Sequence, residues 1–355
     1  MKPLDDAKFS GTKDVDERLK IDSANLQPWI DEYVPNAGKI KAIEQFKGGQ
    51  SNPTYKIITE SKNLVLRRKP PGKLLPSAHA VDREYKVITA LYETDVPVPK
   101  TYGLCEDDDV AGTAFFVMDF LDGDLFWDPM IPSMTNTDRT EIYKNKNKTL
   151  AKLHSVDYKK IGLEDYGKPG NYVARQVSRW SKQYRASETD NIEAMNNLID
   201  WLPKNRPQAD EVSIAHGDFR MGNLVLHPTK PEVVAILDWE LSTIGHPLAD
   251  LAYNCMPYSL PCDGTSLNGL LGLNFSEHGI PDLEDYVNKY ATRTGRSSIP
   301  NFNFFLAFSC FRLASICQGV YARGLQGNAS SENAIEVGAK APRLAKIGWE
   351  IAQGK

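Results

Sequence analysis

The residues His216-Gly217-Asp218-Phe219-Arg220-Met221-Gly222-Asn223 form the most informative stretch of this 355-residue sequence. Two short apolar runs follow, Asn223-Leu-Val-Leu-His and Val233-Val-Ala-Ile-Leu-Asp, with Pro-Thr-Lys-Pro between them. Apolar runs around a proline-containing turn predict a β-hairpin. The stretch therefore combines a loop acid, an amide five positions later and a second acid, Asp238, at the end of a hairpin.

These three polar residues meet the needs of phosphoryl transfer. One carboxylate must orient the attacking hydroxyl and accept its proton, a role that suits Asp218. Amide and carboxylate oxygens are suitable ligands for Mg²⁺, which bridges nucleotide phosphates, so Asn223 and Asp238 are the predicted metal ligands. The alternative is a chance set of turn residues, because Asp, Asn and Gly all favour loops. We favour the functional interpretation because both the residue types and their spacing are those that phosphoryl transfer requires.

Composition excludes several other classes of protein. The chain carries 42 Lys and Arg against 46 Asp and Glu, and this formal charge of −4 argues against a general nucleic-acid binder. No uninterrupted apolar run exceeds five residues, so no membrane-spanning segment is expected. The five cysteines form no CxxC pair, which predicts neither a disulfide framework nor a zinc site. The first residues lack the apolar core of a secretion signal, which predicts a cytoplasmic protein.

Periodicity predicts an α+β protein with two lobes. We expect an N-terminal arm over residues 1–26, a small β-rich lobe over 27–121 and a large, mainly helical lobe over 122–355. Strands are expected at 55–59, 64–67 and 114–118. Helices are expected over residues 78–92, with Ser77 as a possible N-cap, and over 138–154, 172–187, 192–202, 282–293 and 302–321.

A glycine-containing segment joins two strand-like runs in the small lobe. Gly48, Gly49, Ser51 and Asn52 are suited to bringing backbone N–H groups close to nucleotide phosphates. A plain Gly-Gly hairpin without a ligand is the alternative.

The strand that follows carries a second candidate phosphate contact. Its alternation places Val65 and Arg67 on one face, so that Val65 can cover a base while Arg67 reaches phosphate. Arg68 and Lys69 follow directly, so the alternative is a solvated basic strand end.

With its HGDxxxxN motif, the sequence resembles the aminoglycoside phosphotransferase and choline kinase-like group, over residues 46–253. The resemblance implies a protein-kinase-like bilobal fold, ATP and Mg²⁺ as cofactors, and a small molecule as phosphate acceptor. In that group's motif the acid is the catalytic base and the amide binds metal, which correspond here to Asp218 and Asn223. The acid of the next strand, corresponding to Asp238, is a principal metal ligand.

The same resemblance completes the predicted nucleotide site. It favours Arg67 as the phosphate-binding cation. Glu84 lies with Val81 and Ile88 on the inward stripe of its helix, where a carboxylate needs a partner, so we predict an ion pair between Glu84 and Arg67. The alternative is a surface pair within the helix. Met118 would lie in the interlobe hinge facing adenine, or simply in a buried strand.

Three other polar residues are predicted to support the catalytic loop. Asp250 resembles the group's structural acid that braces this loop, although an acid in the first turn of a helix is an equal alternative. His216 is expected to hold the loop geometry, since Asp218 already fills the role of base. A lone histidine at a helix end, such as His154, is more often a packing residue.

Cations near the predicted centre favour an anionic acceptor. Arg175 and Arg179 lie on one helix, Arg220 lies in the catalytic loop, and Arg312 interrupts a nearly all-apolar helix. We predict these residues, with Glu240, to bind the acceptor, since cations near a phosphotransfer centre suit a carboxylate or phosphates. The alternative is that most of these side chains are solvated.

A finer resemblance points to the same acceptor class. Gly48-Gly-Gln-Ser-Asn-Pro-Thr-Tyr, Leu66-Arg-Arg-Lys-Pro-Pro-Gly, Arg175-Gln-Val-Ser-Arg-Trp and Asp238-Trp-Glu are similar to the kinase-like domain attached to acyl-CoA dehydrogenases. That subfamily implies a hydroxyacyl-CoA or a related hydroxy acid as acceptor. An aminoglycoside-type kinase and a non-catalytic nucleotide-binding pseudokinase are the competing hypotheses. The oligomeric state is left open.

Overall fold

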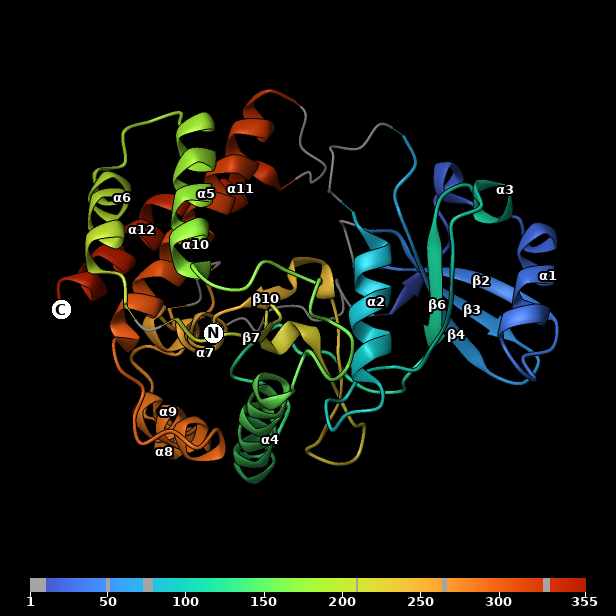
Figure 1. Cartoon of the computed structure of the whole chain (residues 1–355), viewed down its shortest axis with the longest axis horizontal. Helices are drawn as coiled ribbons and strands as arrows, with labels where there is room; N and C mark the ends of the chain where they lie inside the picture. The colour runs from blue at the N-terminus through green and yellow to red at the C-terminus, as the bar shows by residue number, and fades with distance from the viewer. Residues whose placement is uncertain (1–10, 49–51, 73–78, 209, 264–266, 328–332) are drawn as a thin grey trace.

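The computed structural model describes residues 11–48, 52–72, 79–208, 210–263, 267–327 and 333–355. These residues form two lobes, one built on a twisted β-sheet and the other mainly helical (Figure 1). The predicted α+β bilobal fold is thereby confirmed. The described part of the chain crosses between the lobes just after the last strand of the sheet, β6 (Phe115–Asp119).

The small lobe contains a six-stranded antiparallel sheet in the order β1-β2-β3-β4-β6-β5. Strand β4 (Asn63–Arg68), in the interior of the sheet, is buried on both faces. Leu64 and Leu66 pack toward α1 (Ser23–Tyr33), and Val65 packs in the cluster that continues into the large lobe. The other strands are β1 (Thr12–Lys13), β2 (Ile40–Phe46), β3 (Thr54–Thr59), β4 (Asn63–Arg68) and β5 (Thr101–Cys105).

Helices cover the two faces of this sheet. Helix α2 (Val81–Leu91) lies on the face toward the large lobe, whereas α1 (Ser23–Tyr33) and α3 (Asp108–Ala111) lie on the far side (Figure 1). The predicted start of α2 at residue 78 is three residues early, and Ser77 lies outside the described residues.

The N-terminal arm is more integrated than a separate segment over 1–26 would be. Strand β1 pairs with β2 at the edge of the sheet. The Asp22 carboxylate accepts a hydrogen bond from the Ala24 amide and starts α1 at Ser23, so residue 26 falls inside a helix.

The large lobe is organised around α10 (Phe302–Leu325), which packs against α5, α6, α7, α11 and α12. Among the helices that the structure describes, α10 alone is long and apolar enough to cross a membrane, but 78% of that apolar window is buried inside the protein. The remaining helices are α4 (Asn136–Ser155), α5 (Tyr172–Ala186), α6 (Glu193–Asn205), α7 (Pro247–Cys255), α8 (Phe275–His278), α9 (Leu283–Arg293), α11 (Ala334–Gly338) and α12 (Ala341–Ala352).

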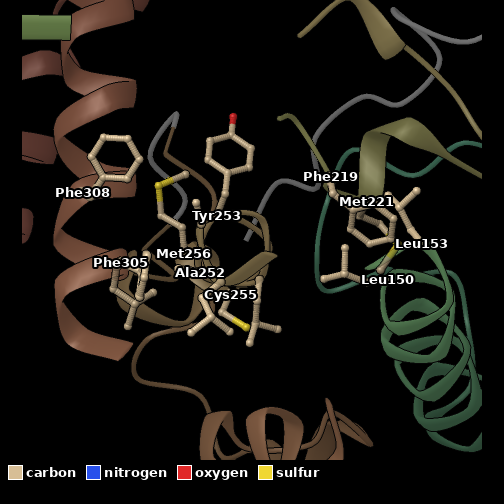
Figure 2. Packing of buried hydrophobic residues seen from close by; sticks show 14 of the residues in the cluster. Leu150, Leu153, Phe219, Met221, Ala252, Tyr253, Cys255, Met256, Phe305 and Phe308 are labelled. Atoms are coloured by element: carbon tan, nitrogen blue, oxygen red, sulfur yellow. The ribbon is translucent and has the colours of Figure 1, made fainter. Parts of the chain in front are cut away.

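Two small β-ribbons hold the motif residues in the large lobe. The predicted hairpin is confirmed as β8 (Leu224–Leu226) and β9 (Val233–Ile236), and a second ribbon pairs β7 (Ser213–Ala215) with β10 (Thr243–Gly245). The loop between β7 and β8 carries the HGDxxxxN motif. Phe219 and Met221 of this loop pack against Leu150 and Leu153 of α4, which anchors the loop from below (Figure 2).

Candidate active site

A cavity of about 1010 Å³ lies between the two lobes. Its walls include Val65, Arg67 and Met118 from the sheet and Asn223 and Asp238 from the large lobe. The antiparallel register of β4 and β6 places Val65 opposite Met118, and Arg67 opposite Phe116. Val65 and Met118, which are predicted to contact the nucleotide base, are therefore neighbours in the cavity wall. Arg67, the predicted phosphate-binding cation, lies two positions further along the same strand as Val65.

The predicted ion pair between Arg67 and Glu84 is confirmed. The Arg67 Nε lies 2.9 Å from Glu84 Oε2, and both side chains are buried. Arg67 Nη2 also donates to Asp238 Oδ1 at 2.7 Å. Burial alone would lower the pKa of Arg67, but Glu84, Asp238 and Glu240 together raise it, so the guanidinium stays charged.

Asn52 supports this pair from the glycine-containing segment. Its side chain is fully buried and donates to Glu84 Oε1 at 3.0 Å. His79 Nδ1 lies 3.0 Å from Oδ1 of the Asn52 side chain. The nucleotide contact predicted for Asn52 concerns its backbone N–H and stays a prediction, whereas its side chain holds the Glu84 carboxylate. Gly48 lines the cavity, whereas Gly49 and Ser51 lie outside the described residues.

The catalytic loop brings three motif side chains together. Asn223 Nδ2 donates to the Asp218 backbone oxygen at 2.9 Å and to Asp218 Oδ2 at 2.8 Å. Arg220 Nε donates to the same Oδ2 at 3.2 Å, and its guanidinium lies 4.7 Å from the Trp127 ring centroid. These two donors fix the orientation of the Asp218 carboxylate.

The loop is held by the predicted structural residues. Asp250 accepts hydrogen bonds from the backbone amides of His216 and Gly217. His216 Nε2 bonds to the Leu237 carbonyl oxygen at 2.9 Å, and its Nδ1 accepts from the Asp218 amide at 3.2 Å. The roles predicted for Asp250 and His216 are confirmed. His216 thus connects the base-bearing loop to the residue that precedes Asp238.

Glycine is required next to Asp218. Gly217 has φ +84°, and a Cβ atom there would lie 2.6 Å from the Leu241 carbonyl oxygen. This φ is one that residues with side chains rarely adopt. The backbone therefore turns toward Asp218 at a position where both conformation and space exclude a side chain.

A buried acid and histidine lie beneath the loop. The His154 Nε2 lies 3.4 Å from Asp250 Oδ2, and its Nδ1 lies 2.6 Å from the Tyr290 hydroxyl. Burial would raise the pKa of Asp250, but His154, His216 and the Gly217 amide together lower it. His154 is therefore a packing and bracing residue, as expected for a histidine at a helix end.

The oxygen atoms of Asn223 and Asp238 are suitable ligands for Mg²⁺. Because the Asn223 amide nitrogen is committed to Asp218, the amide carbonyl oxygen remains as an acceptor, and no described residue donates to it. Asp238 Oδ2 likewise has no hydrogen-bond donor in the described residues, and Asn223 and Asp238 both line the cavity. Mg²⁺ commonly takes one or two protein oxygens and completes its shell with water and phosphate. Two side chains suffice, although the described residues contain no cluster of three His, Cys, Asp or Glu.

The predicted acceptor-binding residues separate into two groups. Arg220 lines the cavity, and Arg312 is buried on α10 near Tyr253. Arg175 instead donates to the Gly170 and Lys168 carbonyl oxygens, and the exposed Arg179 lies over the Trp180 ring. Half-buried Glu240 lies near Arg67, without lining the cavity.

Tyr253 is a site residue that sequence reasoning missed. It is buried, its ring centroid lies 5.4 Å from the Arg312 guanidinium, and its helix also carries Asp250, which holds the loop that bears Asp218. Burial and Asp218 raise the pKa of Tyr253 well above its ordinary range, against the opposing effect of Arg312 and Arg220. The signal was its position three residues after Asp250, which places it one helical turn from the loop brace.

Comparison with known proteins assigns a family. A model described as "Phosphotransferase enzyme family" matches residues 42–273. Acyl-CoA dehydrogenase family member 10 of Mus musculus is 46% identical over 308 residues, covering 87% of this chain and 29% of that protein. Member 11 of Homo sapiens is 42% identical over 353 residues, covering 97% of this chain and 45% of that protein. The chain thus spans less than half the length of these two curated relatives.

Solved structures agree in fold. A Ralstonia eutropha JMP134 protein named as a candidate aminoglycoside phosphotransferase has a TM-score of 0.86 and 47% identity, covering 94% of this chain and 99% of that one. A ternary complex of aminoglycoside phosphotransferase APH(4)-Ia with ADP and hygromycin B has a TM-score of 0.61 at 12% identity, covering 93% and 99%. At that identity the likeness concerns the fold alone. The chain therefore belongs to the phosphotransferase enzyme family.

Proposed function

We propose that this phosphotransferase uses Mg²⁺ and ATP to phosphorylate the hydroxyl of a small anionic molecule, a hydroxy acid or a hydroxyacyl-CoA. The observation that carries the chemistry is the arrangement of Asp218. Its Oδ2 accepts from Asn223 at 2.8 Å and from Arg220 at 3.2 Å. Asn223 and Arg220 both line the interlobe cavity, which also contains Arg67 and Asp238.

In the proposed reaction Asp218 orients the acceptor hydroxyl and takes its proton. The acceptor oxygen forms a bond to the γ-phosphorus while the bond between that phosphorus and the β,γ-bridging oxygen breaks, so that ADP leaves. Positioning and charge stabilisation supply most of the catalysis in such sites. Arg67 offers its charge to the phosphates, and Glu84 fixes the direction in which its guanidinium points.

Asn223 and Asp238 are the residues that would hold Mg²⁺. When bound, this ion neutralises charge on the phosphates. Val65 and Met118 would flank the adenine ring of the nucleotide, since they are cross-strand neighbours at the cavity wall. The ADP in the fold neighbour APH(4)-Ia is consistent with a nucleotide in this cleft.

An anionic acceptor is favoured by the cations beside the base. Arg220 lines the cavity and bonds to Asp218, and the Arg312 guanidinium lies 5.4 Å from the Tyr253 ring centroid. The names of the curated relatives, which refer to acyl-CoA dehydrogenases, support an acyl or hydroxyacyl compound. An aminoglycoside acceptor is the second candidate, because the Ralstonia relative is named for that activity.

The test is Mg²⁺-dependent ADP formation with three acceptor panels: hydroxy acids, hydroxyacyl-CoAs and aminoglycosides. We expect turnover with the anionic panels and a loss of about 10²-fold to 10⁴-fold in Asp218→Asn, with ATP affinity little changed. Asp285→Asn, a change of an exposed acid on α9, is the matched control and should leave the rate unchanged.

Each other outcome contradicts part of the proposal. Turnover with aminoglycosides alone would keep the mechanism and overturn the acceptor class. Full turnover in Asp218→Asn would overturn the assigned base. ATP binding without turnover on any panel would favour a pseudokinase.

A further inference from the structure

Arg312 is a buried cation without a carboxylate partner. It lies in the middle of α10 and is 8% exposed. No acid in the described part of the chain forms an ion pair with it, and its Nε has no hydrogen-bond partner. Burial of a charged group without pairing is costly, so buried charges in proteins are paired or bind a ligand. Arg312 therefore has an N–H group without a hydrogen-bond partner at a buried position, where leaving it unpaired costs free energy.

Two aromatic rings hold this guanidinium. Its Cζ lies 5.6 Å from the Trp180 ring centroid and 5.4 Å from the Tyr253 ring centroid. Cation–π contacts recover part of the lost hydration. A carboxylate or phosphate is recognised by the N–H groups of a guanidinium, and the Arg312 Nε has no hydrogen-bond partner among the described residues. The rings therefore fix Arg312 in place without using the donors that an anion needs.

Tyr253 connects Arg312 to the catalytic carboxylate. Its ring contacts the guanidinium, and one helical turn earlier on α7 Asp250 accepts a hydrogen bond from the amide of Gly217, the residue before Asp218. In Figure 2 the Tyr253 hydroxyl points away from the apolar side chains of Ala252, Cys255 and Met256 that surround the base of the ring. Tyr253 thus places the Arg312 side chain beside the helix whose Asp250 holds the loop that bears Asp218.

Arg220 is a poorer candidate for the same task. Its Nε is bound to Asp218 Oδ2, which compensates its charge. Arg312 has no such acid in the described residues. The two arginines therefore differ in role: Arg220 acts on the base, and Arg312 is available to the acceptor.

We propose that Arg312, held between Trp180 and Tyr253, binds the anionic group of the acceptor and selects acids against neutral and cationic alcohols. Tyr253 sets the separation between that anion and the hydroxyl at Asp218. The inference rests on the proposed phosphotransfer and adds the residue that decides which acceptors are used. A carboxylate is the simplest group with this chemistry.

The experiment uses a homologous series of ω-hydroxy carboxylic acids, from 3-hydroxypropanoate to 6-hydroxyhexanoate, with the corresponding amides as uncharged partners. Initial rates of ADP formation give kcat and KM for each compound. Trp180 fluorescence reports acid binding in the absence of turnover, because this ring contacts Arg312. The variant Trp180→Phe shows how much of the fluorescence change comes from Trp180.

The variants separate charge from packing. Arg312→Gln removes the charge and Arg312→Lys retains it. Arg323→Gln, at an exposed position on the same helix, is the matched control. We expect Arg312→Gln to raise KM for the best acid by about tenfold to 100-fold, the effect of a lost charge-assisted hydrogen bond. KM for ATP and for the amides should stay within about twofold, and Arg312→Lys should restore part of the preference for acids.

The two proposals fail in different ways. An equal loss for acids and amides in Arg312→Gln, or no loss for either, overturns the role of Arg312 while leaving the phosphotransfer intact. An acid that binds through Arg312, as reported by fluorescence, without being phosphorylated supports the anion site and overturns the acceptor proposed for the reaction. Failure of every acid both to bind and to react overturns the anion site.

Discussion

Arg67 in the small lobe and Asp238 in the large lobe, 171 residues apart in the sequence, form an ion pair with 2.7 Å between Nη2 and Oδ1. The guanidinium bonds at the same time to Glu84, so one cation connects the sheet, α2 and the hairpin of the large lobe. Asp238 has φ +65°, an uncommon conformation for a residue with a side chain, and such residues concentrate at functional sites. A candidate metal ligand is therefore held by a lobe-bridging cation.

The first prediction concerns the buried ion pair between Arg67 and Glu84. Glu84 is 1% exposed, so Arg67→Gln leaves a buried carboxylate without its cation and should lower the free energy of unfolding by about 3–5 kcal/mol. Adding Glu84→Gln should recover part of this loss, because both charges are then gone. Urea unfolding of the two single variants and the double variant measures the coupling.

The exposed pair between Lys41 and Glu60 provides the control for this cycle. Its side chains are 57% and 45% exposed, so the same cycle there should give a coupling below about 1 kcal/mol. Additive effects of Arg67→Gln and Glu84→Gln would contradict the prediction.

Regular elements made this part of the site predictable. The strand period of two places Val65 and Arg67 on one face, and the helical period places Glu84 on the inward stripe of α2. The spacing in the HGDxxxxN loop likewise predicted that Asp218 and Asn223 belong to one site, and their side chains are hydrogen-bonded. In each case the residues lie within a few positions of one another or on an element whose period fixes their direction.

Contacts that depend on loops and on helix packing were not predictable in this way. Arg175 was predicted to bind the acceptor, but it donates to carbonyl oxygens of the preceding loop, whose path no periodicity determines. The side-chain bond from Asn52 to Glu84 was likewise not predicted, because it joins a loop residue to a helix. Tyr253 and Arg312 meet because α7 packs against α10, a pairing that the sequence pattern does not encode.

The second prediction tests the turn beside the base. Gly217→Ala introduces a Cβ 2.6 Å from the Leu241 carbonyl oxygen at a φ of +84°, so the backbone bearing Asp218 must shift. A displacement of about 1 Å in a catalytic group can cost about 100-fold in rate. We expect kcat to fall by roughly that factor, measured by ADP formation, with a loss of stability as well.

Gly162→Ala separates strain from steric contact. Gly162 has φ +74° and nothing within 4 Å of a Cβ atom, so alanine there carries only the conformational cost, about 1–2 kcal/mol. Its kcat should remain that of the parent protein. An unchanged kcat in Gly217→Ala would show that the loop tolerates a side chain at this turn.

The third prediction concerns a buried lysine beneath the site. Lys146 on α4 is 3% exposed, and burial lowers its pKa to about 8. Its ordinary value is about 10.4, so between these two pH values the unfolded chain binds a proton that the folded chain does not. Stability must then rise with pH through this interval, with a slope of at most about 1.4 kcal/mol per pH unit. Below about pH 8 Lys146 is protonated in both states and its full burial penalty is present.

Buried tyrosines also titrate differently in the folded and unfolded chains, so the informative quantity is the difference between the parent protein and Lys146→Met. We expect the advantage of Lys146→Met in urea unfolding to be largest near pH 7 and to shrink by about 3 kcal/mol as the pH approaches about 10.4. Lys144→Met, at a position 57% exposed on the same helix, should show no such dependence. A constant difference between the parent and Lys146→Met across this range would mean that the folded protein holds Lys146 in its charged form, because a group with the same pKa in both states adds no slope to the stability curve.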